Sequence, residues 1–176
     1  MSYQNWNQTL IESTATGSAI SAQSATDLRP DCDFTFPTNY FWIGSHLRIT
    51  ALGIASTTTG SNTMTFSVQM GATTISQALG AITLVASQTN QKFKLVLDIE
   101  CRAIGSGTAT TFMVQGIFNC STALLAVTTQ LLPSSGAGAL GTGVDATATQ
   151  KLQLMGAWSA ASNSITVEQY ELTSLN

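Results

Sequence analysis

The chain has 176 residues, of which 6 are Lys or Arg and 9 are Asp or Glu, so charged residues make up only 9% of it. A typical soluble domain carries about 25% charged residues. The hydrophobic share of 44% argues against a disordered chain, which combines low hydrophobicity with high net charge. The net charge of −3 and the lack of a Lys/Arg cluster argue against binding to nucleic acid. No apolar run approaches the length of a membrane span, and residues 1–7 do not resemble a signal peptide.

The low charge content predicts that neighbouring subunits cover part of the surface. A folded monomer of 18.4 kDa exposes roughly 8,000 Å² of surface. Fifteen charged side chains spread over that area are few for a soluble monomer. The chain also contains 27 Thr and 19 Ser, whose hydroxyl groups can keep an uncharged surface hydrated. The low charge is thus explained either by contacts between subunits or by a hydroxyl-rich surface, and we favour contacts between subunits.

Residues 1–33 differ from the rest, because small polar residues dominate them and no strong period is visible. Such a segment cannot bury enough apolar area to fold alone. We therefore predict an extended N-terminal arm over residues 1–33, followed by a single domain over residues 34–176. Trp6, Leu10 and Ile11 are the side chains that could anchor the arm on a partner.

Alternation of apolar and polar residues predicts strands along most of residues 34–176. The expected strands are 46–54, 63–70, 81–86, 92–102, 110–120, 121–132, 149–158 and 164–172, and residues 71–72 are expected to turn the chain into 73–76. A change of phase in the last of these predicts a β-bulge near Glu168. The Gly-rich stretch 133–144 is predicted to be a long mobile loop. With about eight strands and no convincing helix, we expect an all-β protein with a single antiparallel sandwich, an eight-stranded jelly roll.

Polar residues that could carry chemistry are scattered along the chain. His46 has no metal-ligand spacing around it, and Asp31-Cys32-Asp33 lacks the further oxygens that Ca²⁺ needs, so a turn is the favoured interpretation there. Asp98 and Glu100 share a strand face, as the carboxylates of a glycoside hydrolase could, but Lys and Arg residues lie on the same face. A ladder of alternating charges is favoured instead. We expect no catalytic residue, no cofactor and no metal site.

Three aromatic residues, Tyr40, Phe41 and Trp42, precede the first clear strand. They could stack on sugars, anchor a partner or cap the core. Tyr40 and Trp42 join the candidate interface residues for this reason. The Gly-rich stretch 136–143 lacks the Lys of a phosphate-binding loop. The three cysteines are odd in number and show no C-x-x-C spacing, so we expect free, buried thiols.

Several short segments resemble small virion proteins of tailed bacteriophages and prophages. The similar segments are residues 41–44 (FWIG), 47–53 (LRITALG), 101–108 (CRAIGSGT) and 167–176 (VEQYELTSLN). The resemblance spans roughly residues 40–176, leaves out the N-terminal arm, and contains no catalytic motif. It implies a jelly-roll structural protein of the virion, of the capsid decoration or cement type.

The resemblance, together with the low charge, leads to a functional expectation. We expect a non-enzymatic protein that forms dimers or trimers with itself and binds the major capsid protein, bridging capsomers to stabilise the shell. The alternative is a receptor- or glycan-binding β-sandwich of a head or tail fibre. In both cases the expected location is the virion, with no nucleic acid and no membrane as partner.

Overall fold

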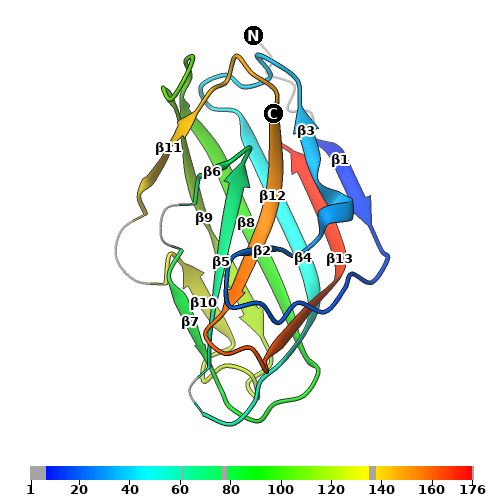
Figure 1. Cartoon of the computed structure of the whole chain (residues 1–176). Coiled ribbons are helices and arrows are strands. Elements are labelled where there is room, and N and C mark those ends of the chain that lie inside the picture. The colour runs from blue at the N-terminus through cyan, green and yellow to red at the C-terminus, as the bar shows by residue number, and fades with distance from the viewer. Residues whose placement is uncertain (1–6, 61, 77–78, 135–137, 176) are drawn as a thin grey trace.

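The fold comes from a computed structural model, in which residues 7–60, 62–76, 79–134 and 138–175 are described. These residues form two antiparallel sheets that lie face to face and enclose one hydrophobic core (Figure 1). The predicted all-β sandwich is confirmed. The helical content of the described ranges is one 3₁₀ turn at Pro30–Cys32. Within the same ranges, no helix has the length and apolar character needed to span a membrane.

The larger sheet has seven strands in the order β1–β13–β4–β8–β9–β10, and β11 pairs with β9 on the same side as β10. Its strands are β1 (Gln8–Ser13), β4 (His46–Ser56), β8 (Gln91–Ala103), β9 (Thr110–Cys120), β10 (Thr129–Leu132), β11 (Leu140–Val144) and β13 (Ser164–Ser174). The run β13–β4–β8–β9 places the last strand of the chain beside β4, and β5, β6 and β7 of the smaller sheet lie between β4 and β8 in the sequence.

The smaller sheet has six strands centred on β12 and β5. Its order is β2–β12–β5–β6, with β3 also on β12 and β7 also on β5. The strands are β2 (Thr26–Asp27), β3 (Phe34–Phe36), β5 (Asn62–Met70), β6 (Thr73–Thr74), β7 (Ala81–Leu84) and β12 (Gln150–Trp158). The thirteen described strands exceed the expected eight, because several pieces of two to six residues are too short to show a period.

Strict alternation in the long strands produces the core. In β8 the odd-numbered residues from Phe93 to Cys101 are buried, while the even-numbered ones face outward. The rings of Phe66, Phe93 and Phe118 meet between the sheets, with centroids 5.5–6.5 Å apart. Burying such a side chain contributes about 1.5–3 kcal/mol. This cluster holds the two sheets together.

The segment that we predicted to be an arm is extended, and from residue 8 onward it lies against both sheets. β1 pairs with β13, Ile20 forms a bridge with Ile165, and β2 pairs with β12. Arg29 follows β2 and is buried, with 2% of its surface exposed. The chain therefore forms an edge of its own sandwich before it enters β3.

Two predicted features differ from the structure. Only residues 129–132 of the predicted strand 121–132 pair with β9. The apolar residues before them, Leu124 and Leu125, lie in turns where they are buried. The prediction of a loop over 133–144 is wrong for 140–144, which form β11, while residues 135–137 lie outside the described ranges. At Gly141 a Cβ would collide with the backbone of Ile75, so this glycine permits close strand contact rather than a loop.

Candidate functional site

A turn at one end of the sandwich presents two large apolar side chains to solvent. We call residues 42–45 the Trp42 turn. Ser45 closes it, since its backbone N–H donates to the Trp42 carbonyl and its hydroxyl accepts from the Trp42 N–H, both at 2.9 Å. Gly44 has φ +91°, which suits the third position of a type II turn. Trp42 is 51% exposed and Ile43 is 65% exposed.

The Trp42 turn is fixed to the end of β8. The Gly44 N–H donates to the Cys101 carbonyl at 2.8 Å, and the Cys101 N–H donates to the Ser45 carbonyl at 2.9 Å. A fixed turn loses little conformational entropy when its exposed side chains meet a partner. The geometry therefore suits a preformed contact site.

The other residues that the sequence singled out as anchors have different surroundings. The half-buried ring of Tyr40 lies 4.7 Å from Phe36 and 5.3 Å from Phe41, so it packs on the core. Leu10 and Ile11 are half-buried and pack against the core from β1. Trp6 lies outside the described residues. Of the five predicted interface residues, Trp42 is the one that the structure shows mostly exposed.

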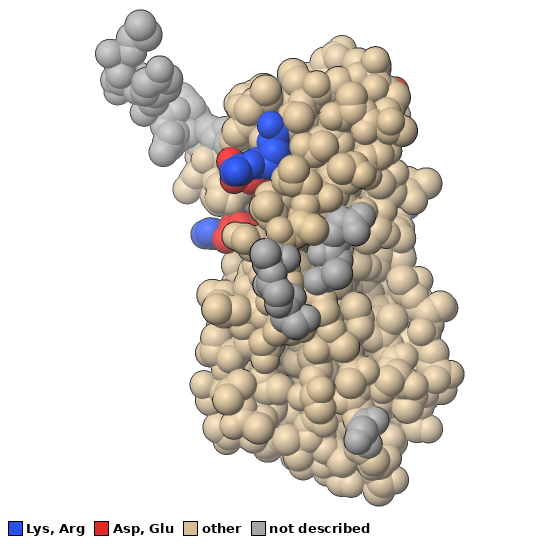
Figure 2. Space-filling view, turned by 90° about the vertical axis from the view of Figure 1, so that its left-hand side faces the viewer, with Lys and Arg blue, Asp and Glu red and all other residues tan. Residues whose placement is uncertain are grey.

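One long side of the sandwich is made from uncharged sequence. No Lys, Arg, Asp, Glu or His occurs in residues 49–91 or 103–144. The first range contains β5, β6 and β7, the second contains β9, β10 and β11, and the sheet orders place both sets at the same side of the molecule. Figure 2 views the molecule from this side: few charged residues are visible there, and most of them are grouped at the upper left. We call this surface the uncharged side.

Large apolar side chains are exposed on the uncharged side. Leu131 of β10 is 66% exposed and lies directly opposite Ile117 of β9, which in turn lies opposite Val96 of β8. These three residues form a row across the outer face of the larger sheet. The other large apolar residues that are exposed in the two uncharged ranges are Val85, Ile104, Val127 and Leu140. An exposed apolar patch with few charges is typical of a protein–protein contact surface.

The carboxylates of Asp98 and Glu100 belong to a charge ladder, as predicted. Asp98 accepts two hydrogen bonds from the guanidinium of Arg48, at 2.7 and 3.1 Å, and His46 Nε2 lies 3.3 Å from its Oδ1. Glu100 accepts from Arg102 at 2.9 Å. The sequence missed Arg48, because its partner is 50 residues away and the register of β4 against β8 was unknown.

The Asp31–Cys32–Asp33 segment forms a turn, as predicted, and its carboxylates have protein partners. Asp31 pairs with Arg29 through two hydrogen bonds, at 2.9 and 2.7 Å. Asp33 accepts from Lys151 at 2.8 Å, and it shares the side-chain amide of Gln153 with Asp27. Across the described ranges, no group of three or more His, Cys, Asp or Glu side chains could hold a metal ion.

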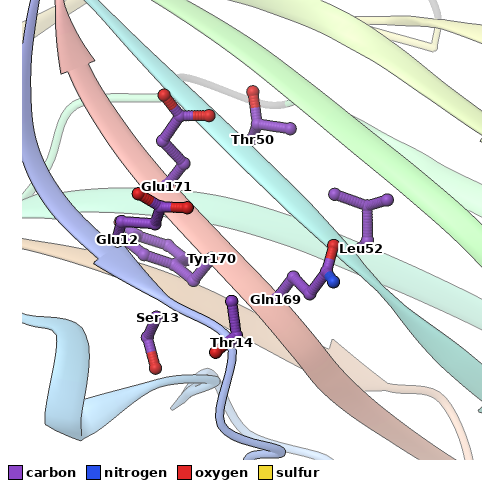
Figure 3. A pocket seen from close by; sticks show the side chains of 8 residues that line it. All are labelled: Glu12, Ser13, Thr14, Thr50, Leu52, Gln169, Tyr170 and Glu171. Carbon is purple, nitrogen blue, oxygen red and sulfur yellow. The ribbon is translucent and has the colours of Figure 1, made fainter.

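A groove crosses the outer face of the larger sheet beside β13. Two shallow pockets of about 120 and 270 Å³ share Thr14, Leu52 and Gln169, so they are continuous. Figure 3 shows the first pocket, in which Glu12 from β1 and Glu171 from β13 stand next to each other and the Gln169 amide lies toward Leu52. The second pocket adds carboxylate, ammonium and hydroxyl groups from Glu168, Lys92 and Thr16.

The groove lies at the β-bulge that the sequence predicted. The register of β13 against β4 shifts between Val167 and Gln169, so the bulge at Glu168 is confirmed. Bulges often re-aim a side chain next to a binding site. The phase change in the sequence was therefore the signal for this site, although it could not show which neighbouring strands complete the groove.

The three cysteines are free, as predicted. Cys32 and Cys101 are buried, and Cys120 is half-buried. Burial raises the pKa of all three thiols, to about 11 for Cys120. Groups of this kind are poor nucleophiles near neutral pH, because the thiolate is the reactive form.

Comparison with known proteins gives one remote likeness. No protein-family model and no curated protein matches the chain. The solved structure of the CBM2 module of the evolved Dit of Lactobacillus casei BL23 phage J-1 is similar over 99% of this chain and 98% of that chain, at 8% sequence identity and a TM-score of 0.40. A likeness at this level does not transfer a ligand or a role to this chain.

Proposed function

We propose that this chain is a non-enzymatic structural protein of a phage particle, which associates with copies of itself and with a neighbouring shell protein through the uncharged side. The assignment to a phage particle rests on the sequence resemblance. The mode of action is supported by one structural observation: the uncharged ranges 49–91 and 103–144 come together on one side and expose large apolar residues there.

The energetics of such a contact favour association. A standard interface buries about 800 Å² on each partner, and its centre is depleted of charged residues. Two copies of the uncharged side can meet without like-charge repulsion and without removing ions from water. A protein that binds the assembled shell but not the free subunits stabilises the shell by mass action. This would be the action of a cement protein.

The oligomeric state tests the proposal directly. We expect light scattering coupled to size exclusion to show a dimer or trimer at micromolar concentration. Leu131→Glu places a charge at the most exposed apolar position of the row and should shift the protein to the monomer. Thr35→Glu is the matched control, because Thr35 is exposed on β3 at the opposite side of the smaller sheet. A wild-type protein that stays monomeric at all concentrations would contradict self-association.

A receptor- or glycan-binding role is the second candidate, and the Trp42 turn favours it. Exposed tryptophan is enriched at binding hot spots, and its flat ring can also stack on a sugar. In this case Trp42→Ala should abolish attachment of the purified protein to host cells while leaving self-association intact. Immunogold labelling of the particle separates the candidates, since labelling of the head supports the cement role and labelling of the tail supports the receptor role.

A further inference from the structure

The groove beside β13 exists because the pairing of β13 with β1 and its pairing with β4 are interrupted at the same level. β1 pairs with β13 as far as Ser13 opposite Tyr170, and the next contact is the Gly17 N–H donating to the Val167 carbonyl at 2.9 Å. Three residues, 14–16, therefore face the two residues at the bulge, and this segment forms one wall of the groove. Leu52 of β4 lines both pockets between the walls.

Buried Arg29 holds this wall in place. Its Nη2 donates to the Ser13 hydroxyl at 2.8 Å, and its Nη1 donates to the Val167 carbonyl at 3.4 Å. Ser13 is the last residue of β1 that pairs with β13, and Val167 is the residue of β13 that the chain contacts next. Arg29 therefore fixes both ends of the segment 14–16. The groove is therefore supported on both sides by one side chain that is itself fixed by Asp31.

Two of the polar side chains around the groove have partners within the protein: Glu171 accepts from the Thr173 hydroxyl, and Ser13 accepts from Arg29, both at 2.8 Å. The others have none in the described part of the protein. Glu12, Glu168, Gln169 and Lys92 make no hydrogen bond or ion pair there, and the hydroxyls of Thr14 and Thr16 also have none. The groove is thus lined by acceptors, donors and groups that can do both. Polar and apolar atoms contribute about equally to its surface, and Leu52 lines both pockets.

We infer that the groove binds a neutral saccharide. Each sugar hydroxyl both donates and accepts, which matches carboxylates, an amide, an ammonium and threonine hydroxyls arranged around one space. Three carboxylates against one ammonium disfavour anionic ligands such as phosphates or acidic glycans. The combined volume suits one or two sugar rings. This site is separate from the Trp42 turn and does not depend on self-association.

The test uses the full chain with maltotriose, cellotriose and tri-N-acetylchitotriose as neutral probes and hexa-arginine as a cationic probe. We expect at least one saccharide to shift the amide resonances of Thr14 and Gln169 in ¹⁵N-correlated NMR spectra. Gln169→Ala should weaken that binding by about tenfold, the value of a hydrogen bond to a polar ligand group. Thr35→Ala is the control and should leave the affinity unchanged, because Thr35 is exposed on β3 of the smaller sheet and lines neither pocket. Thermal unfolding of each variant checks that it is folded.

Three results would overturn the inference. The first is no shift with any of the saccharides at about 10 mM, above the millimolar range of weak ligands. The second is a saccharide response that Trp42→Ala removes and Gln169→Ala does not. The third is preferential binding of hexa-arginine that is lost in Glu12→Gln, which would identify the groove as a site for a basic peptide. In each case self-association through the uncharged side is measured separately and can still hold.

Discussion

The guanidinium of Arg29 makes a two-point contact with the carboxylate of Asp31, at 2.9 Å from Nε to Oδ1 and 2.7 Å from Nη2 to Oδ2. The two partners differ sharply in exposure, since the side chain of Arg29 is 1% exposed and that of Asp31 is 57% exposed. Arg29 also bonds to Ser13 and to the Val167 carbonyl. It therefore connects the N-terminal segment to the last strand of the sandwich.

Replacing Arg29 should destabilise the protein. We expect Arg29→Met to lower the free energy of unfolding by about 2 kcal/mol, because the variant loses the charge-assisted hydrogen bonds from Arg29 to Asp31 and Ser13. Urea unfolding followed by tryptophan fluorescence measures the change. Arg102→Met is the control, since Arg102 and Glu100 are both about half exposed and should contribute at most about 0.5 kcal/mol. Equal effects of the two variants would contradict the role of Arg29.

The same pair predicts a pH dependence of stability. The hydrogen bonds from Arg29 hold the pKa of Asp31 at about 2, below the ordinary value of about 3.9. The contribution of Asp31 to stability is therefore complete above about pH 4 and is lost as the pH falls toward 2. Asp27 acts with the opposite sign, because burial raises its pKa.

Comparison with Asp31→Asn isolates the contribution of Asp31. We expect wild type to be more stable than this variant at pH 6 and the difference to shrink as the pH falls from 4 to 2. High salt should reduce the difference at pH 6, since Asp31 is exposed to solvent. Chemical unfolding at a series of pH values gives the measurement. A difference that stays constant over this range would show that the ion pair does not stabilise the fold.

The sequence predicts the long strands well because their side chains alternate without interruption. Residues 110–120 match β9 at both ends, and the predicted strand 92–102 lies within β8. The bulge at Glu168 was visible because apolar residues change phase there. Short strands such as β2 and β11 were missed, because two to five residues give no period and glycine indicates a loop.

The candidate sites depend on contacts that one-dimensional patterns do not contain. The uncharged ranges 49–91 and 103–144 are visible in the sequence, but their meeting on one side follows from the sheet order. Likewise, Thr14 and Lys92 line one groove only because β1, β13, β4 and β8 are neighbours. Alternation shows which face of a strand is outward, and it does not show which strand lies next to it.

The thiols should be unreactive in the folded protein. The pKa of Cys120 is raised to about 11 by burial, so almost none of it is thiolate at pH 8. We expect iodoacetamide to modify folded protein slowly, with half-buried Cys120 reacting before Cys32 and Cys101. In guanidinium chloride all three should react at the rate of a free thiol with a pKa of about 8.5. Intact-mass spectrometry over time measures this, and rapid modification of the folded protein would contradict the raised pKa values.

Gly53 should be required for the bulge in β13. A Cβ at this position would collide with the carbonyl oxygen of Thr166 and lie 3.0 Å from the Cα of Val167, both on the neighbouring strand β13. Because both neighbours are backbone atoms, they cannot move aside as a side chain can. We expect Gly53→Ala to lower the free energy of unfolding by about 3 kcal/mol.

Gly60→Ala is the control: Gly60 has open space around it and φ +104°, so only backbone strain of about 1 kcal/mol applies. If the groove binds a saccharide, Gly53→Ala should also weaken that binding in protein that remains folded, since it displaces the bulge at Glu168. A Gly53→Ala protein as stable as Gly60→Ala would show that β13 can retreat from β4, and that the bulge does not depend on this glycine.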